Sequence, residues 1–155
     1  MQINFPEELF DRLTDNAKES LRQAAGIASK LGAIYVGTEH ILLGVLAQGD
    51  SVGAKILQKS GVNLERAQTS LNLSGGVALG LVSKGLSETA KLTIRMSLDV
   101  AAEFNQEFCG TEHILYSILL QKNARATTLL RDMKVDIGDV TSELEKYLNK
   151  QQVLS

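Results

Sequence analysis

The sequence predicts an all-α protein in which two tandem, pseudo-twofold-related four-helix repeats pack as one eight-helix domain. Two observations support this prediction. The motif Gly-Thr-Glu-His-Ile occurs twice, at 37–41 and 110–114, an offset of 73 residues. In each copy, apolar residues recur at steps of three and four, as on the buried face of a helix. No stretch shows the sustained alternation that is typical of a strand.

The repeat extends far beyond the motif. At the same offset, residues 13–71 align with 86–144 without a gap, and 16 of the 59 pairs are identical. Composition alone would give about a quarter of that number. We therefore place one double-repeat domain at 1–149, with repeat one at 10–72, a Gly-rich connector at 73–85 and repeat two at 86–149. Residues 150–155 form a tail or the start of a linker. Either repeat alone would bury little core, so we expect the two to pack together.

The four helices of repeat one are delimited by capping residues and by glycines, which end helices readily. In chain order these markers are Thr14 or Asp15, Gly32, Thr38, Gly49, Gly61 and Asn63. The expected buried faces carry Leu13, Ala17, Leu21, Ala24, Ala28 and Leu31, then Ile41, Leu42, Val45 and Leu46, then Val52, Ile56 and Leu57, and finally Leu64, Ala67 and Leu71.

Repeat two follows the same scheme, and Asp136 is expected to cap its fourth helix. Its buried faces carry Leu86, Ala90, Ile94, Ala101 and Phe104, then Ile114, Leu115, Ile118 and Leu119, then Leu129, Leu130 and Met133, and finally Ile137, Val140, Leu144 and Leu148.

The repeated motif has a purely structural interpretation as a helix start. Thr38 and Thr111 are expected to be N-caps, whose hydroxyls accept a backbone N–H. The carboxylates of Glu39 and Glu112 then lie near the positive end of the helix dipole. This interpretation accounts for every residue type except the histidine. We expect the two imidazoles to be partly buried and hydrogen-bonded to a neighbouring loop or helix end.

A metal site or a catalytic centre is a weaker interpretation. Two Glu-His pairs could in principle supply four ligands, but adjacent helical residues point about 100° apart. Cys109 could be a nucleophile near His113, yet its counterpart in repeat one is Val36, so a small buried hydrophobe is expected. The glycines of 75–85 lack the Gly-Lys-Ser/Thr order of a phosphate-binding loop. We therefore predict no enzyme activity, no metal and no cofactor in this domain.

The composition bears on which classes of partner this domain can bind. The net charge is −2, which gives no electrostatic case for nucleic acid or for an anionic membrane. A single cysteine fits a reducing compartment, and no apolar run is long enough to span a bilayer. The sequence is interpreted as a soluble cytosolic protein or as a domain of a larger one.

The motifs resemble a known family. Residues 10–57 are similar to the N-terminal domain of the Clp ATPases, especially the ClpC type, and the resemblance extends over about 10–148. It rests on a start motif, the histidine motif and a third short motif, carried here by Phe10, Leu13, Thr14, Ala17 and Lys18, by 37–44, and by Gly53, Ala54, Lys55 and Leu57.

The resemblance implies a non-catalytic domain that docks adaptor proteins and protein substrates for an ATPase ring, which unfolds them and feeds the ClpP peptidase. It also implies a cytoplasmic location, or the plastid stroma if the source is a plant. In ClpC-type domains the motif glutamates resemble the residues that receive phosphorylated arginine, so the implied ligand-binding residues are Glu39 and Glu112 together with Thr38 and Thr111. A carboxylate suits a guanidinium, and the N–H groups of a helix start could hold the phosphate.

Two further alternatives stay open. The chain could be a stand-alone Clp-like accessory protein that binds and tunes the protease core, and the sequence that follows Ser155 in the gene would decide. Adaptors could also dock on the first helices of the repeats, although solvated faces are the preferred interpretation there, at Phe10, Arg12, Lys18, Arg22, Lys91 and Arg95.

Repeat two departs more from the family pattern, with Tyr116 and Ser117 in the motif helix and "QKNARA" after it. We therefore expect the first motif to retain binding better than the second.

Overall fold

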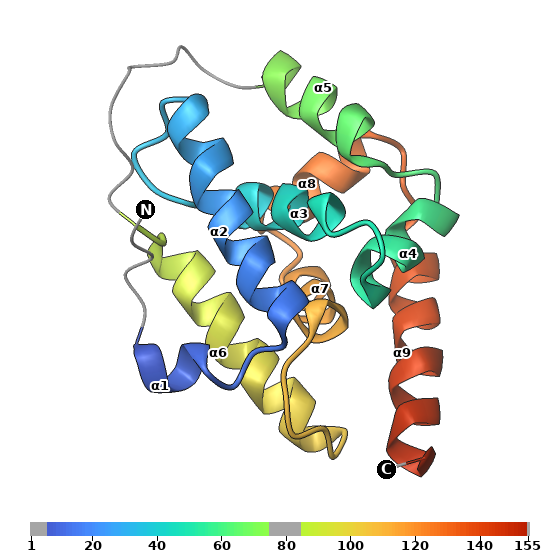
Figure 1. Cartoon of the computed structure of the whole chain (residues 1–155). Coiled ribbons are helices and arrows are strands. Elements are labelled where there is room, and N and C mark those ends of the chain that lie inside the picture. Colours follow the sequence, from blue (N-terminus) through green and yellow to red (C-terminus); the bar gives the residue numbers. More distant parts are fainter. Residues whose placement is uncertain (1–5, 75–84, 155) are drawn as a thin grey trace.

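A computed structural model describes residues 6–74 and 85–154 and confirms the all-α fold (Figure 1). The described residues form nine helices: α1 Glu7–Phe10, α2 Asp15–Lys30, α3 Thr38–Ala47, α4 Val52–Lys59, α5 Leu64–Ser74, α6 Glu88–Glu103, α7 Thr111–Leu120, α8 Arg125–Asp132 and α9 Ile137–Leu154. The eight expected helices are α2 to α9, and α1 is a short addition. Helix α9 continues beyond 149. Most of the connector expected at 73–85 lies outside the described residues.

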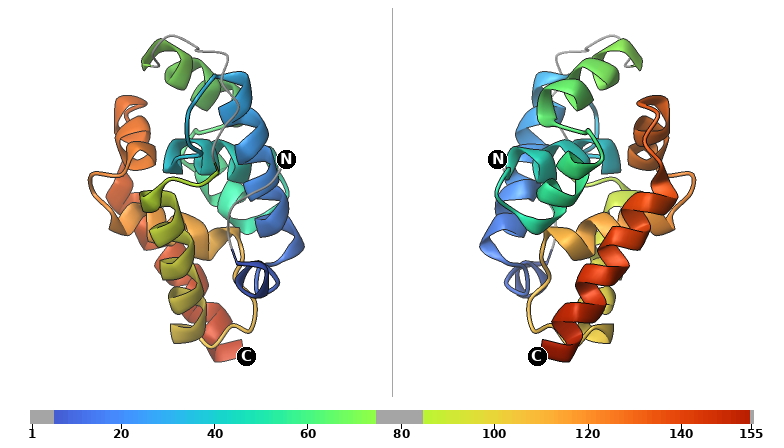
Figure 2. Two further views of the ribbon diagram at one scale, coloured as in Figure 1. Left: turned by 90° about the vertical axis from the view of Figure 1, so that its left-hand side faces the viewer. Right: turned by 90° about the vertical axis from the view of Figure 1, so that its right-hand side faces the viewer.

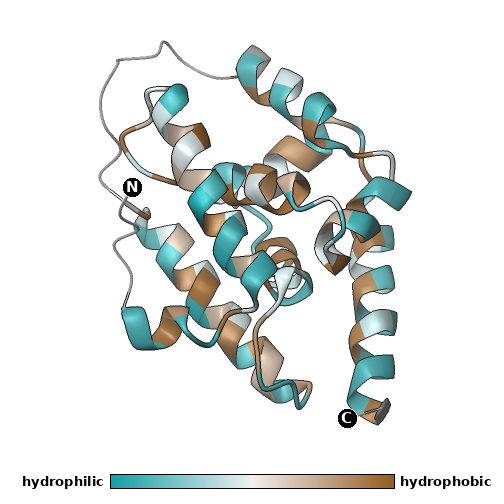
Figure 3. Cartoon of the chain, in the orientation of Figure 1, coloured by the Kyte–Doolittle hydropathy of each residue, from teal (hydrophilic) through white to brown (hydrophobic). Residues whose placement is uncertain are grey.

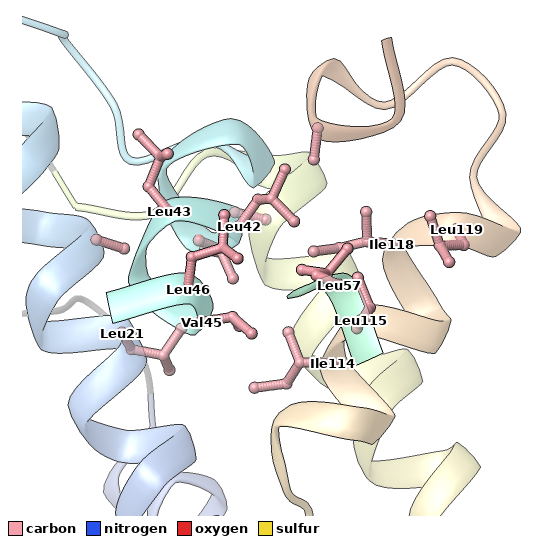
Figure 4. Close-up of a cluster of buried hydrophobic side chains, with 14 of the residues drawn as sticks. Leu21, Leu42, Leu43, Val45, Leu46, Leu57, Ile114, Leu115, Ile118 and Leu119 are labelled. Atoms are coloured by element: carbon pink, nitrogen blue, oxygen red, sulfur yellow. The ribbon is translucent and has the colours of Figure 1, made fainter. Parts of the chain in front are cut away.

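The two motif helices form the centre of the fold. Nearly every residue of α3 is buried, and α7 is almost as enclosed. A helix that is apolar on all sides needs neighbours on all sides, and α3 packs against α2, α4, α5, α6, α7 and α8. Side chains of α2, α3, α4 and α7 meet in one cluster (Figure 4). Hydrophilic and hydrophobic residues alternate along the outer helices α2 and α9 (Figure 3), as expected for helices with one face toward the core.

The two repeats interlock rather than lying side by side. The residue before α2 pairs with the segment before α7, since Thr14 N–H donates to the Cys109 carbonyl at 2.8 Å. The equivalent bond in the other repeat, at the 73-residue offset, is also present: the Ser87 N–H donates to the Val36 carbonyl at 2.9 Å. Helix α3 likewise packs on α8, and α4 on α7. These matched contacts relate the two four-helix repeats as a pseudo-twofold pair, and residues of both repeats form one core, as predicted. Figure 2 shows the helices of the two repeats from two further sides.

Local signals fix the ends of several helices. Thr14 caps α2 by accepting the Ala17 N–H at 3.2 Å. The predicted caps of α5 and α9 are confirmed. The carboxamide oxygen of Asn63 accepts the Arg66 N–H at 2.8 Å, and a carboxylate oxygen of Asp136 accepts the Asp139 N–H at 3.1 Å.

The backbone also repeats its left-handed positions. Gly32, after α2, has φ +68°, and its counterpart Asn105, after α6, has φ +59°. Gly61 and its counterpart Lys134 have φ +83° and +63°. Glycine and asparagine tolerate this conformation, whereas lysine adopts it at a cost. The repeats thus keep the same turns even where repeat two has lost the glycine.

Within 6–74 and 85–154, none of the helices has both the length and the apolar character that spanning a bilayer requires.

Candidate functional site

The repeated motif opens α3 and α7, but not in the way the sequence indicates. The N-cap residues are Gly37 and Gly110, with extended backbone, and each helix begins at the threonine. Glu39 and Glu112 are therefore the second helical residues, and the histidines are the third. The sequence-based assignment of Thr38 and Thr111 as N-caps of their own helices is wrong.

The two threonines instead cap helices of the opposite repeat. Thr111 Oγ1 accepts the Gly53 N–H near the start of α4 at 2.9 Å. Thr38 Oγ1 accepts the Ala126 N–H near the start of α8 at 3.1 Å. Both hydroxyls are buried, with residue exposures of 2 % and 3 %. This pair of bonds ties the motif helix of each repeat to the third helix of the other.

Replacing either threonine by valine should loosen the interlock. Thr111→Val keeps the volume but leaves the buried Gly53 N–H without its acceptor, which should lower the free energy of unfolding by about 1–2 kcal/mol. Thr38→Val should have a similar effect through Ala126. Urea denaturation would measure both. Thr111→Ser and Thr38→Ser retain the hydroxyl, and if they were as damaging as the valine variants, the cross-repeat bonds would not be the cause.

The histidines complete the helix starts. His40 Nδ1 accepts the Gly37 N–H at 2.9 Å, and His113 Nδ1 accepts the Gly110 N–H at 2.8 Å. The third helical residue thus reaches back to the N-cap, as glutamate or glutamine does in a capping box. Both imidazoles are bonded to a helix end, as expected, but they are fully rather than partly buried, and the helix is their own rather than a neighbouring one.

Burial keeps both imidazoles neutral. It lowers the pKa of His113 to about 4. Burial also lowers the pKa of His40. The negative charge of Glu39 acts to raise this pKa, and the positive charge of Arg125 acts to lower it further. Glu39 Oε1 lies 3.9 Å from His40 Nδ1. Because that nitrogen accepts a backbone N–H, it carries no proton for Glu39, and the approach is not an ion pair.

Glu39 is a buried carboxylate at the start of α3. The residue is only 5 % exposed, and its side chain folds against Gly37, where a Cβ would overlap Oε1. Oε2 lies 3.5 Å from Nη1 of Arg125, the first residue of α8. Among the described residues, Oε1 is buried without a hydrogen-bond partner. A buried carboxylate with one oxygen unsatisfied is suited to a donor-rich cation.

Glu112 has the same backbone position but a different environment. It is half-buried, and its side chain also folds against the N-cap glycine, Gly110. Burial raises its pKa, against the effect of a hydrogen bond from its own backbone N–H. Burial, and after it the charge of Glu112, raises the pKa of Tyr147 on α9. The second motif therefore presents a more exposed carboxylate beside a tyrosine.

Four other residues singled out in the sequence make contacts that are structural: Cys109, Phe10, Lys18 and Arg22. Cys109 is buried, and burial raises the pKa of its thiol, as expected for a small core residue rather than a nucleophile. On the outer face of α2, Lys18 and Arg22 lie over the Phe10 ring, with their charged groups 5.9 Å and 5.5 Å from its centroid. In the described part of the chain, no group of three or more His, Cys, Asp or Glu side chains could hold a metal ion.

Sequence reasoning missed Arg125. It lies 86 residues from Glu39 along the chain, and only the cross-repeat packing of α3 on α8 brings the two together. The available signal was the 73-residue offset itself. At that offset Arg125 stands opposite Val52, so a charged side chain occupies a position that is apolar in repeat one.

Comparison with known proteins agrees with this architecture. The family described as the Clp repeat (R) N-terminal domain matches the chain twice, over residues 12–76 and 85–155. The chaperone protein ClpC1, chloroplastic, of Arabidopsis thaliana is 30 % identical over 144 residues, which cover 92 % of this chain and 16 % of that protein. The chain thus spans about a sixth of the length of that relative.

Solved structures show the same fold at low sequence identity. The N-terminal domain of the ClpD chaperone from Arabidopsis thaliana superposes with a TM-score of 0.76 at 18 % identity, covering 90 % of this chain and 99 % of that one. A complex of a ClpV N-domain with a VipB peptide gives 0.73 at 16 % identity, covering 96 % and 93 %.

Proposed function

Because the chain belongs to the Clp repeat N-terminal domain family, we propose that it is a non-catalytic docking domain that receives adaptor and substrate proteins for a Clp-type unfoldase feeding the ClpP peptidase. The ClpV relative bound to a VipB peptide supports a docking role for this fold. The relatives with chloroplastic names support a plastid setting.

The finer part of the proposal concerns the ligand. Glu39 and Glu112 hold carboxylates at two pseudo-twofold-related helix starts, and this arrangement carries the proposal. A carboxylate pairs with a guanidinium, and the first N–H groups of a helix have no partner within it and favour a phosphate. Phosphoarginine carries both groups on one side chain.

Thr38 and Thr111 belong to the same proposed sites. Their hydroxyls are buried and engaged with the opposite repeat, so the groups they would offer are their backbone N–H donors at the first helical position. Their side chains would act indirectly, by fixing where each helix start lies.

Isothermal titration with phosphoarginine tests this proposal on the chain as it stands. We expect Glu39→Gln together with Glu112→Gln to weaken binding about tenfold or more, because the near-isosteric amide removes the charge that a guanidinium needs. The matched control is Glu65→Gln together with Glu143→Gln, two glutamates outside the motifs, which should leave binding unchanged. Phosphoserine, which lacks the guanidinium, should bind more weakly. Absence of phosphoarginine binding, or binding unaffected by the double motif variant, would refute the ligand assignment.

A further inference from the structure

One guanidinium of the chain already lies at one of the two motif glutamates. Arg125 begins α8 of repeat two, and its Nη1 lies 3.5 Å from Glu39 Oε2 in repeat one. The two side chains differ greatly in exposure, at 85 % for Arg125 and 7 % for Glu39. The carboxylate is thus fixed in the protein, and the arginine reaches it from solvent.

The other motif has no equivalent arginine. At the 73-residue offset, Arg125 corresponds to Val52, the first residue of α4. The cross-repeat bonds beside these two positions are matched, since Thr38 bonds Ala126 next to Arg125, and Thr111 bonds Gly53 next to Val52. Both motifs keep the same glycine and histidine geometry. Next to the bonded N–H of the opposite repeat, the first motif thus faces an arginine and the second a valine.

We infer that Arg125 is an internal guanidinium ligand of Glu39, which competes with incoming guanidinium ligands at the first motif and leaves Glu112 as the open site. This inference rests on the proposed function, because it describes how the same two glutamates are regulated. The sequence led us to expect stronger ligand binding at the first motif, because its residues are closer to the family pattern. The inference reverses this order.

The geometry indicates competition of modest strength. Arg125 contacts one carboxylate oxygen at a single long distance, not as a two-bond fork, and Glu39 Oε1 has no partner among the described residues. An incoming guanidinium that bonds both oxygens could displace it. A mostly exposed ion pair contributes little, so the competition should weaken ligand binding at Glu39 by about fivefold.

The opposite role for Arg125 is the main rival. If its charge bound the phosphoryl group of a ligand, the residue would assist binding instead of competing. The two roles predict changes of opposite sign when the guanidinium is removed, so one substitution separates them.

The test uses site-resolved NMR titration of the whole chain with phosphoarginine, followed at the backbone amides of Gly37 and Gly110. In the unmodified chain we expect the Gly110 signal to report binding about fivefold tighter than the Gly37 signal. Arg125→Val reproduces the residue found at the other site and should remove this difference by tightening binding at Gly37. Val52→Arg should weaken binding at Gly110. Equal affinities at the outset, or weaker binding at Gly37 after Arg125→Val, would overturn the inference.

A measurement without ligand keeps this inference separate from the proposed function. The Nε–Hε signal of Arg125 should shift in Glu39→Gln and stay unchanged in Glu112→Gln, because only Glu39 holds the guanidinium. If no variant bound phosphoarginine, the proposed ligand would be wrong, and this signal alone would decide whether Arg125 occupies Glu39. If the Arg125 Nε–Hε signal did not shift in Glu39→Gln, the inference that Arg125 is a ligand of Glu39 would be refuted.

Discussion

Gly44→Ala is expected to lower the free energy of unfolding by about 3 kcal/mol, although it adds a single methyl group. Gly44 lies in the middle of α3, where α2 crosses it. A Cβ at this position would overlap the carbonyl oxygen of Ser20 and come within 3.2 Å of the Ala24 nitrogen. Both obstacles are backbone atoms of a helix that is itself packed into the core, so neither can rotate away. The two helices would have to separate.

Two substitutions serve as controls for Gly44→Ala. Gly26 lies within α2, and a Cβ there would meet nothing within 4 Å, so Gly26→Ala should raise stability by about 0.5–1 kcal/mol through helix propensity. Ser117, the counterpart of Gly44 in α7, is buried and bonds the His113 carbonyl within its own helix. Ser117→Ala should therefore be mild. Urea denaturation of the three variants checks this order, and a neutral Gly44→Ala would show that α2 and α3 are less tightly packed than described.

The helices were predictable from sequence because their signals are local. Apolar spacing, a capping side chain such as Asn63 and a helix-ending glycine such as Gly32 all act within a few residues. The 73-residue repeat then supplied the pseudo-symmetry and, through it, the expectation of one shared core. Helix α1 was missed because four residues are too few to show a period.

The contacts of the candidate site were not predictable in the same way. Thr38 looks like an N-cap in any helix-start motif, and only the packing of α8 shows that its hydroxyl serves Ala126. His40 was unexplained because a histidine that accepts the N-cap N–H replaces a more usual glutamate or glutamine. The Arg125–Glu39 contact joins residues from different repeats, and no local sequence pattern predicts it.

Acid should weaken the fold through His113. Its pKa is about 4 in the folded protein, against about 6.5 for an unfolded histidine, so the unfolded chain binds the proton more tightly. The stabilising contribution is complete above about pH 6.5 and is lost as the pH falls toward 4. Over that window it amounts to about 3 kcal/mol, since each unit of pKa difference corresponds to about 1.4 kcal/mol. His40 acts in the same direction because its pKa is also lowered.

Glu112 acts in the opposite direction, since a raised carboxyl pKa makes the folded state take up its proton first on acidification. The histidine effect is therefore isolated by comparing variants across the same pH range. His113→Gln keeps a side-chain acceptor for the Gly110 N–H, as glutamine does at the third position of a capping box, but it cannot titrate. Its unfolding free energy should fall less steeply between pH 7 and 4 than that of the unmodified chain. Nitrogen NMR should also show the neutral His113 ring protonated at Nε2, with Nδ1 taking up the second proton at a midpoint near 4. A midpoint between 6 and 7 would show that the imidazole reaches solvent and that the start of α7 is held in another way.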